Sequence, residues 1–281
     1  MTQDTTPGAF TRRIVCIADG DHVFTALEDD FHHFYARIGH DGKAIRTVAG
    51  RALRVPRSSC PNAMDGLQRF VGLALDARST GIDASWQCTH AYELVRLAMA
   101  QALRRAAGGS AQREYLIRVP DRIERRTRAV VSRDGQFLFA WDIEGRNIIA
   151  PERFAGVDIF GSSRWPADLD ADQLEAAQVL RRGAWLAVAR VNYVTPPAGV
   201  APVQKSRKPG PAAGACYSYQ PAVEAQASSM DGLNWRDFTQ QPDALLAELG
   251  HPSSVKAMES SSGMTDVSAR PNLANSNRPR R

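Results

Sequence analysis

The chain has 281 residues, of which 43% are hydrophobic and 23% charged, as is typical of a globular protein with a buried core. Its net charge is +5, but acidic and basic side chains are interleaved, which excludes the dense basic stripe of a nucleic-acid-binding protein. Four widely spaced cysteines exclude a secreted disulfide framework, and no apolar run reaches the roughly 18 residues that span a bilayer. We therefore expect a cytoplasmic protein without nucleic-acid or membrane partners. The sequence indicates no oligomeric state.

The first predicted elements are two strands and a helix. Two extended runs, residues 31–38 and 44–55, flank Asp41 and Gly42, a pair typical of a hairpin turn. Proline ends the second run. Apolar residues then recur at helical spacing over residues 61–71, which predicts a helix.

Residues 91–190 predict further helices and strands. Residues 91–105 carry an apolar stripe with helical period. Residues 115–141 alternate extended runs with a turn, which predicts a second β unit. A third helix is expected over residues 171–190, where Asp170 and Gln173 form a capping-box pattern. These elements predict an α+β fold of antiparallel β-hairpin units packed with three main helices.

The composition changes after the third helix. Residues 10–195 contain all the elements above and are expected to form a single domain. Residues 196–281 are rich in Pro, Ala, Ser, Gln and Asn, which predicts a mostly disordered tail. Within it, residues 233–249 carry enough apolar side chains for a short helix or a docking motif.

Two cysteines stand directly before predicted helices and suggest a metal site. The unpaired N–H groups and dipole of a helix start are expected to lower the pKa of a thiol there, and thiolate is the form that binds metal. A tetrahedral site needs three or four such donors on rigid supports. The predicted ligands are Cys60, Cys88, His90 and one of Asp30 or His32. Glu93, one turn after His90, is expected to orient the imidazole as a neighbouring carboxylate.

The same residues allow other interpretations. Cys60 and Cys88 can be small buried hydrophobic residues, with His90 an ordinary residue of a helix start. Nucleophilic catalysis by Cys88 with His90 as its base is another alternative, although side chains two residues apart tend to diverge. The sequence has no glycine-rich nucleotide loop and no standard hydrolase or zinc-protease motif.

The order of several motifs resembles an uncharacterised bacterial family known as a domain of unknown function. The motifs are Asp29-Asp30-Phe31-His32-His33-Phe34, His40-Asp41-Gly42, Ser59-Cys60-Pro61, Cys88-Thr89-His90 and residues 175–182. The resemblance spans about residues 10–195 and implies one functional unit that ends before the tail. It also implies a connection with the catabolism of aromatic compounds or acyl thioesters.

A more distant resemblance concerns the NifU-type iron–sulfur scaffold, which binds zinc or a nascent cluster. It implies a NifU-like core in which Cys60 takes the place of the middle cysteine. Cys88 and His90 would replace the scaffold's His-Cys pair, and Asp30 or His32 would stand on its early loop. The chain departs from the scaffold because its pair is Cys-Thr-His and because only two cysteines are suitably placed.

These observations predict a metal-binding protein. Thiolate and imidazole ligands favour zinc or iron over magnesium or calcium. A metal with an open position could polarise a carbonyl or activate water, as in a hydratase, hydrolase or isomerase acting on a small carbonyl or aromatic catabolite. The alternatives are an iron–sulfur or sulfur carrier and a non-catalytic module with a structural metal. The residues expected to wall an apolar pocket are Phe31, Phe34, Trp86, Tyr92 and Trp141.

Overall fold

The computed structural model describes residues 8–77, 81–83, 86–161, 165–194 and 213–250. Four strands come first, and a long 3₁₀ segment and helix α1 follow them. Their bounds are β1 (Ala9–Asp19), β2 (His22–Asp29), β3 (His33–His40), β4 (Ile45–Arg54), η1 (Cys60–Phe70) and α1 (Thr89–Ala106). Four more strands and a second long helix repeat that order. They are β5 (Gln112–Pro120), β6 (Arg126–Arg133), β7 (Gln136–Glu144), β8 (Asn147–Ala150) and α2 (Ala171–Ala187).

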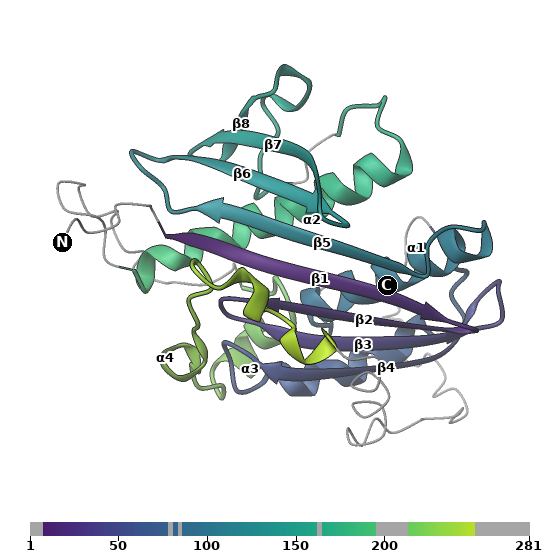
Figure 1. The fold of residues 1–281 in the computed structure, drawn as a ribbon. Helices are drawn as coiled ribbons and strands as arrows, with labels where there is room; N and C mark the ends of the chain where they lie inside the picture. Colours follow the sequence, from purple (N-terminus) through teal and green to yellow (C-terminus); the bar gives the residue numbers. More distant parts are fainter. Residues whose placement is uncertain (1–7, 78–80, 84–85, 162–164, 195–212, 251–281) are drawn as a thin grey trace, which may run out of the picture.

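All eight strands belong to one antiparallel sheet with the order β4-β3-β2-β1-β5-β6-β7-β8 (Figure 1). Each set of four strands is a meander, and the two meanders join where β1 pairs with β5. The molecule therefore consists of two units of the same order, four strands followed by a helix. We call them the first unit (residues 9–106) and the second unit (residues 112–187).

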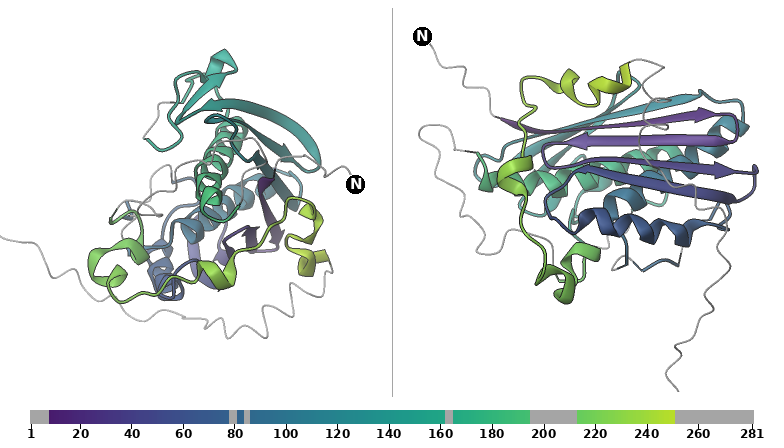
Figure 2. Two further views of the ribbon diagram at one scale, coloured as in Figure 1. Left: turned by 90° about the vertical axis from the view of Figure 1, so that its left-hand side faces the viewer. Right: turned by 90° about the horizontal axis from the view of Figure 1, so that it is seen from below.

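Both long helices cover the same face of the sheet (Figure 2). Helix α1 packs on β1, β2 and β3, whereas α2 packs on β5, β1 and β6. Side chains alternate across β1, so that Phe10 and Ile14 join the main core beneath the helices, while Val15 lies in a smaller cluster on the opposite face. No helix among the described residues is both long and apolar enough to cross a membrane.

The C-terminal segment, residues 213–250, returns to the sheet. It contains α3 (Pro221–Glu224), α4 (Asp231–Asn234) and short 3₁₀ turns. Its last part lies on the face opposite to the helices (Figure 2), where Leu246 packs with Phe24 and Tyr35. This part of the predicted tail is therefore packed on the domain. Residues 195–212 and 251–281, which were also assigned to the tail, lie outside the described residues.

The α+β class is confirmed, and the predicted hairpin corresponds to β3 and β4. The predicted helices over 91–105 and 171–190 correspond to α1 and to α2 with a 3₁₀ extension. The helix expected over 61–71 is a 3₁₀ segment, in which Gly66 approaches the backbone of Trp86 too closely for a β-carbon. The NifU-like core stays a prediction.

Candidate functional site

The turn between β2 and β3 is organised around a buried carboxylate, that of Asp29. Its Oδ1 accepts hydrogen bonds from the backbone N–H groups of Phe31 and His32, each at 2.9 Å, and lies 2.9 Å from Nδ1 of His32. Its Oδ2 accepts a hydrogen bond of 2.6 Å from Arg12. Burial alone would raise the pKa of Asp29, but His32 and Arg12 outweigh it and hold that pKa well below its usual range. Asp29 is therefore a fixed negative charge that orients His32.

Helix α1 begins next to this turn and brings His90 against His32. Their ring centroids are 3.9 Å apart, and the Phe34 ring stacks on His90 at 5.5 Å. The N-cap residue, Cys88, makes no side-chain cap hydrogen bond. Burial and the neighbouring positive charges lower the pKa of His90 well below its usual value, and Nδ1 of His90 has no partner among the described residues. His90 is therefore a neutral imidazole.

Arg12 connects this turn to helix α1. It is fully buried on the helix-facing side of β1, and its second terminal nitrogen donates to Glu93 Oε2 at 2.5 Å. A continuous network thus runs from Glu93 through Arg12 and Asp29 to His32. One guanidinium thus serves as the partner of two carboxylates, so that Arg12 stabilises the negative charge of both.

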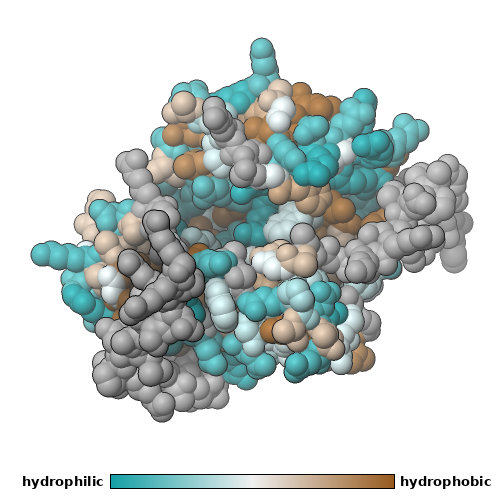
Figure 3. Space-filling view, turned by 180° about the vertical axis from the view of Figure 1, so that it is seen from behind, coloured by the Kyte–Doolittle hydropathy of each residue, from teal (hydrophilic) through white to brown (hydrophobic). Residues whose placement is uncertain are grey.

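Glu93 stands at the edge of a cleft of about 400 Å³ between the two long helices, which we call the α1–α2 cleft. Figure 3 shows this helix-bearing side of the molecule, where hydrophilic residues dominate and the surface is hollowed. Aromatic and charged side chains from both helices and from the loop before α2 form its walls. Those used below are Tyr92, Glu93, Arg96, Phe160, Arg182 and Trp185.

The arginines of the cleft differ in their partners. Arg96 and Arg181 each donate a hydrogen bond to a backbone carbonyl oxygen. Arg182 stacks over the Trp185 ring at 5.0 Å, and within the described parts of the chain no carboxylate is paired with it. Burial lowers the pKa of Arg182, because its charge is taken out of water. The nearby carboxylate of Glu93 opposes this lowering of the pKa without forming an ion pair with Arg182. An anion that entered the cleft would therefore find a guanidinium with no paired carboxylate among the described residues.

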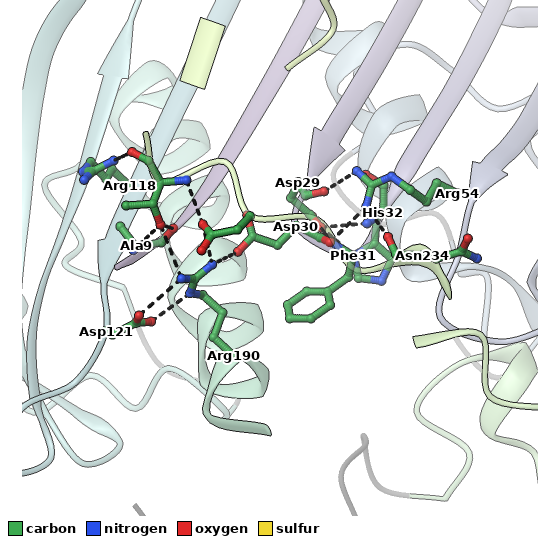
Figure 4. Close-up of polar contacts among 12 residues, drawn as sticks. Ala9, Asp29, Asp30, Phe31, His32, Arg54, Arg118, Asp121, Arg190 and Asn234 are labelled. Atoms are coloured by element: carbon green, nitrogen blue, oxygen red, sulfur yellow. Dashed lines mark hydrogen bonds and ion pairs between the residues drawn. The ribbon is translucent and has the colours of Figure 1, made fainter. Parts of the chain in front are cut away.

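Asp30, a predicted metal ligand, instead pairs with Arg190 in a second buried network (Figure 4). Arg190 is 1% exposed, and it binds Asp121 through two nitrogens at 2.8 and 3.2 Å. Arg190 also donates hydrogen bonds of 3.4 Å to Asp237 and Thr239 of the C-terminal segment. Burial raises the pKa of Asp30 to about 7 against the opposing charge of Arg190. Asp30 thus fastens the β2–β3 turn to the 3₁₀ turn that follows α2 (Val188–Asn192).

Arg54 fastens the same turn from the other side (Figure 4). Its guanidinium donates to the backbone carbonyls of Asp29, Asp30 and His32 at 2.5, 2.9 and 3.3 Å, and to that of Asn234 at 2.9 Å. The turn that carries His32 is therefore rigid.

The two cysteines predicted as metal ligands belong to the main apolar core. Cys60 and Cys88 are buried, and the Cys60 sulfur accepts a hydrogen bond of 3.4 Å from Ser218. Burial raises the pKa of both thiols, so the prediction that the helix starts favour thiolate is wrong. Cys216, assigned to the tail, lies close enough to influence both thiols electrostatically.

A different group has the geometry of a metal site. Donor atoms of Glu28, His33 and Glu248 all lie within 4.8 Å of one another, so these residues could hold a metal ion. These side chains also bind one another directly, because Nε2 of His33 lies 2.9 Å from Glu248. Tyr35 donates a hydrogen bond of 2.5 Å to the same carboxylate. The group joins the C-terminal segment to β2 and β3.

The structure distributes the predicted ligands over three places. His32 and His90 lie in ring contact, Cys60 and Cys88 are buried thiols, and Asp30 pairs with Arg190. Within the residues that the structure describes, they do not form a group of donors as close as the one above. A metal at these residues stays a prediction.

Sequence reasoning gave no individual role to three arginines of the two buried networks and the cleft, Arg12, Arg182 and Arg190. The signal for Arg12 is its position between Phe10 and Ile14 on the apolar face of a strand, where a charge must have a buried partner. Arg182 and Arg190 carry no comparable local signal. Tyr92 does line the cleft, whereas Trp141 and the other predicted wall residues do not.

Comparison with known proteins adds no relative. No protein-family model matches the chain, and no curated protein sequence matches it. The two resemblances stay predictions, and the function is argued from the site.

Proposed function

We propose that this protein binds a small organic anion with an aromatic or acyl body in the α1–α2 cleft. The observation that carries the proposal is Arg182, whose charge faces the cleft without a paired carboxylate among the described residues. A carboxylate ligand would supply that partner through a charge-assisted hydrogen bond. Tyr92, Phe160 and Trp185 offer aromatic surfaces for the body of the ligand.

Glu93 is the residue that can exchange a proton with such a ligand. It lines the same cleft, and its carboxylate accepts a hydrogen bond from the buried Arg12. Arg12 is in turn fixed by Asp29, so Glu93 is positioned by a network that is anchored in the sheet. Hydration and isomerisation of a small carbonyl compound both require such a proton donor and acceptor. These reaction classes are part of the proposal.

Isothermal titration calorimetry with benzoate and with hexanoate tests the binding step. We expect the wild-type protein to bind at least one of them saturably, and Arg182→Gln to weaken that binding about tenfold or more, because a charged hydrogen bond is lost. Arg128→Gln is the matched control, since it removes an exposed arginine of β6. Absence of binding by the wild type, or equal losses in both variants, would refute the proposal.

A structural metal at Glu28, His33 and Glu248 is a second candidate function, favoured by the convergence of their donor atoms. It places the expected zinc or iron at residues other than the predicted ones, and it would fix the C-terminal segment to the sheet. Elemental analysis of the wild type, His33→Ala and Cys88→Ala separates the sites. Metal that is lost only in His33→Ala supports this site, whereas loss in Cys88→Ala supports the predicted site and metal-assisted or cluster chemistry there. Metal-free, folded wild-type protein would exclude both.

A further inference from the structure

A second hollow lies beside the α1–α2 cleft, and three arginines, Phe160, Gly145 and Val188 line it. It has a volume of about 300 Å³ and lies between the β5–β6 turn, the β7–β8 turn and the end of α2. Arg122 and Arg125 come from the first turn and Arg146 from the second. Phe160 lines both this hollow and the cleft, so the two are neighbours.

The charges around the hollow are poorly compensated. Arg122 donates to the carbonyl oxygens of Arg125 and Gly145 at 3.1 and 2.7 Å, but its buried Nη2 has no partner among the described residues. No carboxylate is paired with the Arg125 side chain in the same described ranges, whereas Arg146 pairs with Asp158 at 2.7 Å. Three guanidinium groups thus share one paired carboxylate. The charge of Arg125 adds to burial in lowering the pKa of Arg122.

The backbone that presents Arg125 is strained. Ile123 and Arg126 are joined by two backbone hydrogen bonds of 3.0 and 2.8 Å, so Glu124 and Arg125 form a two-residue hairpin turn. Both have positive φ angles, 47° and 71°. Such turns favour Asn-Gly or Asp-Gly, because larger side chains are disfavoured in this conformation. Strain of this kind concentrates at functional sites.

We propose that this hollow binds the phosphoryl group of a small molecule whose flat or apolar part lies against Phe160. A phosphoryl group carries more than one negative charge and three strong acceptor oxygens, so it can pair with several guanidinium groups at once. The Phe160 ring lies under the Arg146 guanidinium at 5.2 Å, and it is 41% exposed, so its surface is available for the rest of the molecule. The site shares none of its arginines with the α1–α2 cleft.

Phenyl phosphate is the probe, and Arg125→Gly is the decisive variant. Glycine adopts positive φ freely, so this substitution relieves strain while it removes one guanidinium. We expect it to weaken phenyl phosphate binding about tenfold, with a thermal unfolding midpoint equal to or above that of the wild type. Arg128→Gln, on the adjacent strand, removes an equal charge outside the hollow and should leave binding unchanged.

Three results would overturn the proposal. One is a wild-type protein that does not bind phenyl phosphate at millimolar concentration. Another is an equal loss of binding in Arg125→Gly and Arg128→Gln, which would indicate non-specific attraction by surface charge. The third is tighter binding of a single-stranded oligonucleotide that both variants weaken equally, which would make this surface a general polyanion-binding face. Benzoate binding and its dependence on Arg182 are unaffected by any of these results, so the two proposals are tested separately.

Discussion

The two units share the order of their elements but differ in where they place charge. In the first unit, the ion pairs of Arg12 with Asp29 and Glu93 lie inside the protein. In the second unit, Arg126 and Arg128 pair with acidic residues across exposed strands. Buried pairs are costly to break, whereas exposed pairs contribute little to stability. Among these strand pairs, the first unit buries its charge beside the candidate site, whereas the second unit pairs Arg126 and Arg128 at the surface.

The starts of the two helices differ in the same way. Asp170 and Gln173 form a complete capping box at the start of α2. Cys88 at the start of α1 makes no side-chain cap, and the residue two positions on, His90, is in ring contact with His32. One helix start is arranged for stability and the other for the site. The following predictions test this contrast.

The largest effect is expected from Arg12→Met. Removal of the guanidinium leaves the buried carboxylates of Asp29 and Glu93 without their partner, which costs about 3–5 kcal/mol of unfolding free energy. Urea denaturation measures the loss. Arg128→Met in the second unit should cost no more than about 1 kcal/mol, because its partner is exposed. Similar losses in the two variants would remove the contrast between the units.

Gly183→Ala is expected to have the next largest effect, and it concerns packing in the second unit. A β-carbon on Gly183 would lie 2.6 Å from Cγ2 of Ile117 on β5, so α2 would have to move away from the sheet. Overpacking of this kind costs about 1–3 kcal/mol, although alanine favours the helix. The same substitution in an Ile117→Ala background should cost less, and a double-mutant cycle measures the coupling. Additive effects would show that the close approach does not limit stability.

The capping difference predicts a smaller effect. Asp170→Ala removes the hydrogen bond of 2.7 Å from the Gln173 N–H and should cost about 1 kcal/mol in thermal or urea unfolding. Ser59→Ala, at the start of η1, removes no side-chain cap and is the comparison. Equal costs for the two substitutions would mean that the capping box is not the source of the stability.

The smallest expected effect depends on pH and concerns the C-terminal segment. Burial opposes the ionisation of Glu248, but hydrogen bonds from His33 and Tyr35 outweigh it and lower the pKa of Glu248 to about 2. Because the folded-state pKa lies below the unfolded one, this group stabilises the protein above about pH 4.5, and the stabilisation is lost as the pH falls towards 2. Glu248→Gln should therefore reduce stability at pH 6 by about 1 kcal/mol or less. At pH 2 the variant and the wild type should be equal, and an undiminished difference there would contradict this assignment.

The local elements of this fold were predictable because their patterns are periodic. The Asp41-Gly42 turn and the apolar stripe of α1 are local signals, and each corresponds to an observed element. The single eight-stranded sheet was not predictable, since the β1–β5 pairing joins residues about a hundred positions apart. The β5–β6 turn was missed because Glu124 and Arg125 are not turn-forming residues.

The candidate site was predictable only in part, for the same reason. The sequence placed His32, His90 and Glu93 among the residues that matter, and the structure brings the two histidines together. It could not show that Asp30 forms an ion pair with Arg190, far along the chain, and is therefore not a partner of the two histidines. Nor could it show that burial, rather than the helix dipole, controls the pKa of Cys88. Both facts depend on tertiary packing, which no local pattern encodes.

The most direct test of the central claim is thermal unfolding of Arg182→Met with and without benzoate. If the charge of Arg182 serves a ligand and not the fold, the variant without benzoate should unfold at the same temperature as the wild type or higher, because a desolvated charge has been removed. Benzoate should then raise the unfolding temperature of the wild type but not that of the variant. A variant that is less stable than the wild type, or that benzoate still stabilises, would contradict the account.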